Sequence, residues 1–152
     1  MNKLFSAKHL LAGLLVGTLD ITAASIQYFI KTGKNPSGVL RYVASGAFGS
    51  DAFTGGNAML VWGLVFHFMI ALCFSFLFFW LTARLPALLN YKIATACVYG
   101  ILMWSAMKYL VLPFSKIPAS PFNLANAAIA IAILVICIAL PLASIAGKRS
   151  AD

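Results

Sequence analysis

Three ionisable side chains, Asp20, His67 and Lys108, each interrupt a different apolar stretch of the sequence. An ionisable group within the hydrocarbon of a membrane is costly unless it faces a polar partner, so we expect the three to face one another inside a helix bundle. A helical rise of about 1.5 Å per residue places Asp20 and His67 near the midplane, with Lys108 about one turn higher. Because histidine can change its charge near neutral pH, they form a candidate intramembrane polar cluster for protons or a small solute.

The same three residues also have a structural interpretation. Asp20 could form a hydrogen bond between helices, His67 could donate to a backbone carbonyl group, and Lys108 could extend its long side chain toward the outer headgroups. Both interpretations stay open at this stage, since intramembrane ionisable residues often mark functional pathways.

Further polar residues are expected toward the outer half of the membrane. They could line a shallow vestibule above the cluster, or they could simply lie at the membrane interface. These candidate vestibule residues are Gln27, Asn57, Ser105, Tyr109 and Asn126.

The composition places the chain in the membrane. Of its 152 residues, 62% are hydrophobic and only 9% are charged, whereas soluble domains carry about 25% charged residues. The net charge of +8 comes from lysines and arginines that mostly flank the apolar stretches, where such residues contact lipid headgroups. The expected environment is therefore a lipid bilayer, and binding to nucleic acid is not expected.

Four apolar stretches are long enough to cross a bilayer as helices. The first competes with a signal peptide, but its length and the interruption at Asp20 favour a retained helix. The predicted fold class is all-α: a polytopic membrane protein in which residues 1–152 form a single transmembrane domain, a bundle of four helices. The predicted spans cover about 10–30, 57–81, 93–112 and 124–146.

The connection 31–56 contains six of the eleven glycines. Asn35 and Pro36 suit the N-cap and first position of a helix, and an apolar face follows them, which favours a short helix lying at the membrane interface. The alternative is a re-entrant segment with its tight turn at Ser45 to Gly49, protected by the surrounding protein.

Small residues mark the expected contacts between helices. Gly13 and Gly17 form a G-x-x-x-G step on the face that carries Asp20, while Gly63 precedes His67 and Gly100 precedes Lys108 on the corresponding faces of their spans. We expect these four glycines to pack against neighbouring helices. The stripe of the first span could also support a homo-oligomer or a larger membrane complex.

Basic residues predict the topology weakly. Four spans put both termini on one side, and that side holds six lysines and arginines against four on the other, which favours cytoplasmic termini. The six are Lys3, Lys8, Arg84, Lys92, Lys148 and Arg149, and the four are Lys31, Lys34, Arg41 and Lys116.

The motifs of common enzymes are missing from the sequence. There is neither a G-x-S-x-G elbow nor an H-E-x-x-H pair, and the two histidines are His9 and His67. The three cysteines lie in apolar stretches and form no C-x-x-C pair. We therefore expect no enzymatic activity, no metal site and no cofactor.

Several short patterns resemble those of small four-helix bacterial membrane proteins of unknown function. They are G-x-x-x-G-x-x-D in the first span, ASGAFGSDAFTGG in the connection, G-x-x-x-H in the second span and LVLPFS at the end of the third. A more distant likeness is to the YagU-type inner-membrane proteins, which are associated with acid tolerance; this chain lacks their long loop after the first span. The resemblance implies a multi-pass protein of the bacterial inner membrane, with Asp20, Asp51, Gly63 and His67 at the matching positions.

Two functions follow from these observations. The first is a small transporter or channel-like protein whose polar cluster handles protons or a small solute. The second is a scaffold or accessory subunit that packs against a larger membrane complex. A cavity that reaches the cluster would favour the first, and a close-packed interior would favour the second.

Overall fold

The computed structural model describes residues 7–118 and 121–148, and within them the chain is helical, with no strand. Four helical segments, 7–32, 58–84, 86–114 and 124–147, are long and apolar enough to cross a membrane, which confirms the predicted four-span architecture. In chain order the elements are α1 (Ala7–Thr32), α2 (Ser37–Phe48), α3 (Asp51–Thr54), α4 (Ala58–Arg84), η1 (Pro86–Tyr91), α5 (Lys92–Ala106), η2 (Met107–Val111), η3 (Leu112–Phe114), α6 (Leu124–Leu134), η4 (Val135–Ala139) and α7 (Leu140–Lys148).

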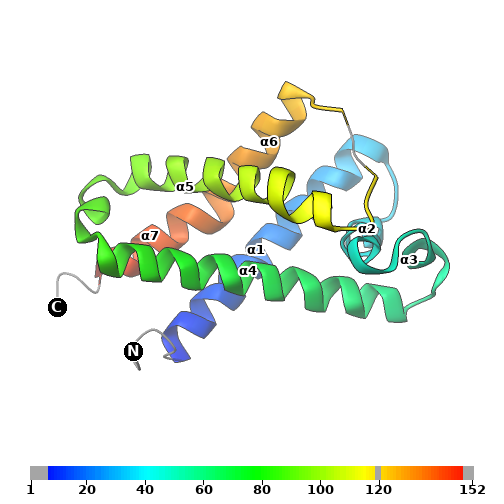
Figure 1. Cartoon of the computed structure of the whole chain (residues 1–152), viewed down its shortest axis with the longest axis horizontal. Helices are drawn as coiled ribbons and strands as arrows, with labels where there is room; N and C mark the ends of the chain where they lie inside the picture. The colour runs from blue at the N-terminus through cyan, green and yellow to red at the C-terminus, as the bar shows by residue number, and fades with distance from the viewer. Residues whose placement is uncertain (1–6, 119–120, 149–152) are drawn as a thin grey trace.

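The spans alternate in direction along the bundle. Helix α1 begins and α7 ends near the turn that joins α4 to α5, and the two longer connections lie at the opposite end (Figure 1). Helix α1 packs mainly on α4, whereas α5 packs on the last span, formed by α6, η4 and α7. The backbones of the consecutive helices α4 and α5 do not approach each other closely, and side chains such as Phe78 of α4 and Tyr99 of α5 meet in the space between them.

Two turns of π-helix interrupt the third and fourth spans, each just before a proline. The Leu112 N–H donates to the Met107 carbonyl group, and the Leu140 N–H donates to the Val135 carbonyl group, five residues earlier in each case. Proline has no N–H to give to the carbonyl group four residues before it, and its ring crowds that group. Pro113 and Pro141 therefore account for the widened turns η2 and η4 that precede them.

A dense hydrophobic core fills the half of the bundle toward the α4–α5 turn, which we call the closed half. Val16, Phe78 and Leu142, from three different spans, are each 0% exposed there. The Phe78 ring meets the Tyr99 ring edge-on at 4.9 Å between centroids. Alanines at helix contacts, such as Ala96 and Ala139, let the helices of this half approach closely.

The glycine-rich connection folds into two short helices. Helix α2 begins at Ser37, one residue later than predicted, and the Asn35 Oδ1 atom accepts a hydrogen bond of 2.9 Å from the Ser37 N–H. Ser45 lies within α2, and the sharp turn comes only at Gly49, whose φ of 64° favours glycine. Helix α2 is too short to span and runs across the end of the bundle, packed on α4 (Figure 1).

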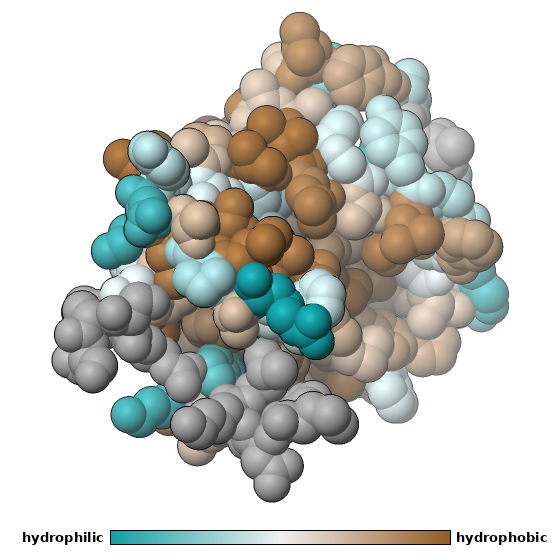
Figure 2. All heavy atoms as spheres, turned by 60° about the vertical axis from the view of Figure 1, so that its left-hand side comes forward, coloured by the Kyte–Doolittle hydropathy of each residue, from teal (hydrophilic) through white to brown (hydrophobic). Residues whose placement is uncertain are grey.

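The outer surface of the spans is apolar. Side chains such as Ile30, Val61 and Ile93 are mostly exposed, as expected for residues that contact lipid. Figure 2 brings the end with the α4–α5 turn forward and shows hydrophobic surface running back along the helices, with hydrophilic residues gathered around the end itself. The chain is thus a multi-pass membrane protein by length, composition and surface.

Candidate functional site

A cavity of about 640 Å³ occupies the half of the bundle opposite the closed half, which we call the open half. It lies between α4 and the last turns of the third span, where these two spans separate, and α1, α2 and η4 complete its wall. The wall is almost entirely apolar. Its polar side chains are Asp20, Tyr42, His67 and Ser115.

Asp20 lies at the junction of two cavities. It borders the large cavity together with His67, and it also borders a second cavity of about 270 Å³ together with Gln27 and Lys108. The side chain of Asp20 is only partly exposed, and its charge interacts with that of His67. The structure therefore brings Asp20 and His67 together, with Asp20 between the other two members of the predicted cluster.

A backbone carbonyl group fixes the histidine ring. His67 Nε2 lies 2.8 Å from the carbonyl oxygen of Gly17 on α1. A carbonyl oxygen can only accept, so Nε2 carries the hydrogen in this contact and any second proton goes to Nδ1. The hydrogen bond expected in the structural interpretation of His67 is thus present, and it leaves Nδ1 as the nitrogen that can gain or lose a proton.

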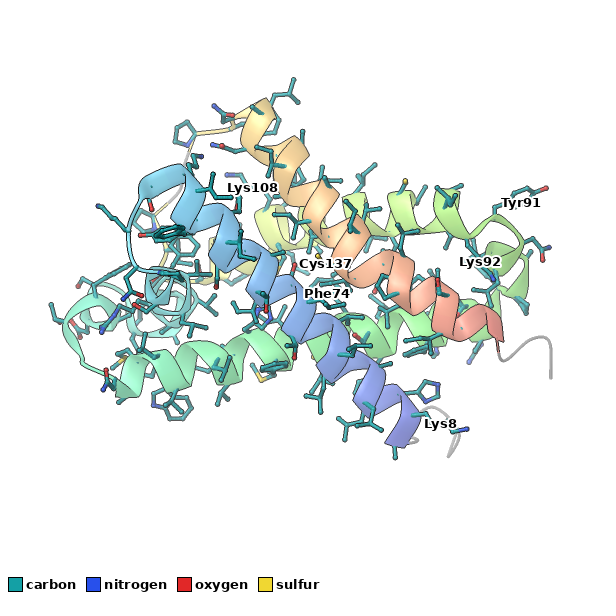
Figure 3. All side chains as sticks on the ribbon, turned by 180° about the vertical axis from the view of Figure 1, so that it is seen from behind. Lys8, Phe74, Tyr91, Lys92, Lys108 and Cys137 are labelled. Carbon is teal, nitrogen blue, oxygen red and sulfur yellow. The ribbon has the colours of Figure 1, made fainter. Side chains whose placement is uncertain are left out.

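Lys108 lies on η2, farther from the α4–α5 turn than Phe74, which lines the large cavity (Figure 3). It lines the second cavity with Asp20 and a third cavity, of about 180 Å³, with Asn123 and Asn126. The second and third cavities share Lys108, Trp104 and Leu112. Neighbouring cavities therefore share lining residues, and the three cavities follow one another from His67 past Asp20 and Lys108 toward the connection between the last two spans.

The predicted vestibule residues do not all gather around this series of cavities. Gln27 lines the second cavity, and Asn126 lines the third, where its Oδ1 accepts a hydrogen bond of 2.6 Å from the Lys31 ammonium group. Asn57, Ser105 and Tyr109 line none of these three cavities. Asn57 is exposed just before α4, and Tyr109 is 66% exposed.

The four predicted packing glycines all lie at close contacts between elements. A Cβ atom added at Gly13 would come within 2.6 Å of Leu72, and one added at Gly17 within 3.0 Å of the Phe68 ring. An added Cβ would collide with the Leu40 carbonyl oxygen of α2 at Gly63, and with the Val135 side chain at Gly100. Gly13 and Gly17 of the first span are thus covered by α4 of the same chain.

Sequence reasoning missed several residues of the site. Met103 and Met107 line the large cavity, and Tyr42 brings a phenol to it from α2. Partial burial raises the pKa of the Tyr42 phenol, so this group stays protonated to higher pH than a fully exposed tyrosine. The Cys137 thiol on η4 interacts electrostatically with Asp20 and lies in the middle of the bundle (Figure 3). The one sequence signal for η4 was Pro141, four residues after Cys137.

No protein-family model matches the chain, and searches of curated proteins and of solved structures returned no match. Among the described residues, no three His, Cys, Asp or Glu side chains lie close enough together to hold a metal ion. The assignment of a function therefore depends on the geometry of the cavities.

Proposed function

We propose that this chain is a small transport protein of the bacterial inner membrane in which Asp20 and His67 carry protons. The observation that supports this most is the position of Asp20, which borders the cavity shared with His67 and also the second cavity that adjoins Lys108. A carboxylate placed between two cavities can exchange a proton with either. A carboxylate that served only to hold helices together would instead be enclosed by packed atoms.

The dense packing of the closed half supports a barrier to protons on the side of Asp20 and His67 that lies away from the cavities. Gly13 and Gly17 bring α1 into close contact with α4 on the side of His67 that faces the closed half. The core around Phe78 lies beyond this contact. A proton reaching Asp20 from the open half thus meets dense packing beyond His67. A transport cycle requires this barrier to open when the pair changes its protonation, as in alternating access.

Proton flux into sealed proteoliposomes after a pH step tests this function. We expect an internal pH dye to report faster acidification with the native protein than with empty vesicles, when valinomycin and potassium clamp the membrane potential. Replacing either member of the pair, Asp20→Asn or His67→Gln, should slow this flux by about tenfold or more, because each removes a proton-binding group.

Asp51→Asn provides the matched control, since Asp51 is an exposed carboxylate on α3, away from the described cavities. Its flux should equal that of the native protein. The function fails if native vesicles acidify no faster than empty ones while Asp20→Asn and His67→Gln lower only the melting temperature. The pair would then be structural, and an accessory role in a larger membrane complex would be the better account.

A further inference from the structure

We propose that the large cavity binds an amphiphilic organic cation, with Asp20 as its counter-charge. This inference rests on the proposed function, because the cation would replace the proton at the Asp20–His67 pair. The volume of about 640 Å³ falls within the range of about 300–1,000 Å³ that is usual for small-molecule sites. An apolar wall with few polar groups is also usual for such sites.

The charges around the cavity favour a cation over an anion. Asp20 is the one acidic residue in the four spans, and it borders this cavity. No described lysine or arginine lines the large cavity; Lys108 lines the second cavity, beyond Asp20. A cationic group in the large cavity therefore meets a carboxylate in surroundings of low dielectric constant, where their attraction is strong.

The remaining wall suits the apolar part of such a ligand. Met69, Met103 and Met107 line the cavity, and thioether side chains adapt to irregular shapes. Phe66 and Phe74 add aromatic rings to the same wall, and aromatic faces attract cations. The wall thus offers adaptable contacts to a bulky apolar body, with its one carboxylate at Asp20.

The cavity opens toward the side of the bundle. Three of its lining residues are largely exposed: Met69 at 53%, Leu110 at 60% and Phe114 at 87%. All three belong to spans, so in a membrane this opening faces lipid. An amphiphilic cation concentrates in the bilayer and would reach Asp20 sideways from it, while a strongly hydrated ion would have no comparable route through this opening.

Titratable groups approach Asp20 and its cavity from four elements. They are His67 of α4, Cys137 of η4, Lys108 of η2 and Tyr42 of α2. With one proton bound, the Asp20–His67 pair carries no net charge. When the cation binds beside the Asp20 carboxylate, this proton leaves the pair for water and the cation takes over its charge. The net charge of the site is unchanged, and one proton is released for each cation bound.

Binding of tetraphenylphosphonium to the purified protein in detergent micelles tests the site, with tetraphenylborate as an anion of nearly the same shape. We expect the protein to bind the phosphonium and not the borate, after subtraction of binding to empty micelles. In weak buffer, binding should release about one proton per phosphonium while the pair is protonated. Affinity should then rise about tenfold per pH unit and level off once the pair has lost its proton.

Variants connect the binding to Asp20. Asp20→Asn should weaken phosphonium binding by about 100-fold or more, because the counter-charge is lost. Asp51→Asn should leave it unchanged, and Asp20→Glu should retain most of it. If Asp20→Asn does not fold, Asp20→Glu can be compared with Ala47→Trp, which places a bulky side chain at the part of the cavity wall formed by α2. Only Ala47→Trp should reduce phosphonium binding.

Equal binding of the two ions, or phosphonium binding that survives Asp20→Asn, would overturn the cation site. The two proposals fail separately. Proton flux through a protein that binds no phosphonium would leave the proposed function standing and remove the cation site. Phosphonium binding with proton release, in a protein that gives no flux after a pH step, would keep the site and remove the proposed proton transport.

Discussion

The closed and open halves of the bundle bury polar groups in different ways. In the closed half, Ser75 and Thr82 donate to carbonyl groups of their own helix, and the Tyr99 hydroxyl donates to the Phe74 carbonyl group of α4 at 2.6 Å. In the open half, Asp20 and His67 border a cavity instead. Hydroxyl groups satisfied by nearby carbonyls support the fold. Ionisable groups beside a cavity keep the capacity to bind something else.

The boundary between the halves runs through shared residues. Phe74, Met103 and Ile138 line the large cavity, and all three also belong to the core or pack against it. The cavity is thus bounded by the core, which holds its inner wall in place. The comparison predicts that changes in the closed half alter stability, whereas changes in the open half alter ligand or proton handling.

The largest effect on stability is expected from Phe78→Ala in the closed half. Phe78 is fully buried, so its truncation to alanine should lower the free energy of unfolding by about 3 kcal/mol. This is the low end for a buried phenylalanine, because the unfolded side chain contacts lipid rather than water, which lessens the transfer cost. Met107→Ala, beside two existing cavities, should cost about 1 kcal/mol. Unfolding by SDS in mixed micelles, followed by tryptophan fluorescence, measures both, and equal losses would remove the distinction between the halves.

Gly63→Ala should come next, at about 2 kcal/mol. The new methyl group would strike the Leu40 carbonyl oxygen, and a backbone atom cannot move without moving α2, which forms part of the cavity wall. Gly46→Ala on α2 is the control, since its Cβ would meet nothing closer than 3.7 Å. We expect Gly63→Ala to reduce proton flux as well as stability and Gly46→Ala to leave stability unchanged. Similar behaviour of the two variants would show that α2 does not depend on this contact.

Tyr99→Phe should have the smallest effect. It removes the hydroxyl that donates to the Phe74 carbonyl group and keeps the ring that packs on Phe78, so the expected loss is about 1 kcal/mol. Tyr109→Phe, at an exposed phenol, should be neutral in the same SDS titration. Neither change should alter proton flux. A strong effect of Tyr99→Phe on flux with unchanged stability would place this residue in the pathway and move the boundary between the halves.

The four spans were predictable because a membrane constrains sequence strongly. Runs of apolar residues at bilayer length specify helices almost regardless of their neighbours. The structure lengthens each predicted span at one or both ends, and the third begins at Pro86 rather than 93, with the 3₁₀ turn η1. Asn90 and Lys92 interrupt the apolar run, so hydropathy began the predicted span only after this turn.

The members of the polar cluster were predictable by type, but their surroundings were not. The cost of placing Asp20 and His67 in lipid singles them out in any sequence. By contrast, the Gly17 carbonyl group that binds His67 is a backbone atom, invisible to residue patterns. The large cavity exists because α4 and the third span separate, and that separation follows from which helices pack together across the whole chain. Local periodicity in the sequence shows which face of a helix packs against the protein. It does not show which other helix that face contacts.

The most direct test of the central claim is the accessibility of single cysteines to a membrane-impermeant methanethiosulfonate carrying a quaternary ammonium group. In proteoliposomes of a chain with Cys73, Cys97 and Cys137 replaced by alanine, Gln27→Cys reports on the second cavity and Ser75→Cys on the closed half. We predict that Gln27→Cys reacts from one side of the membrane only and that Ser75→Cys reacts from neither side until the protein is denatured. Reaction of Ser75→Cys at the rate of Gln27→Cys, or no reaction of Gln27→Cys from either side, would contradict an open half that leads to Asp20 and a closed half that stops there.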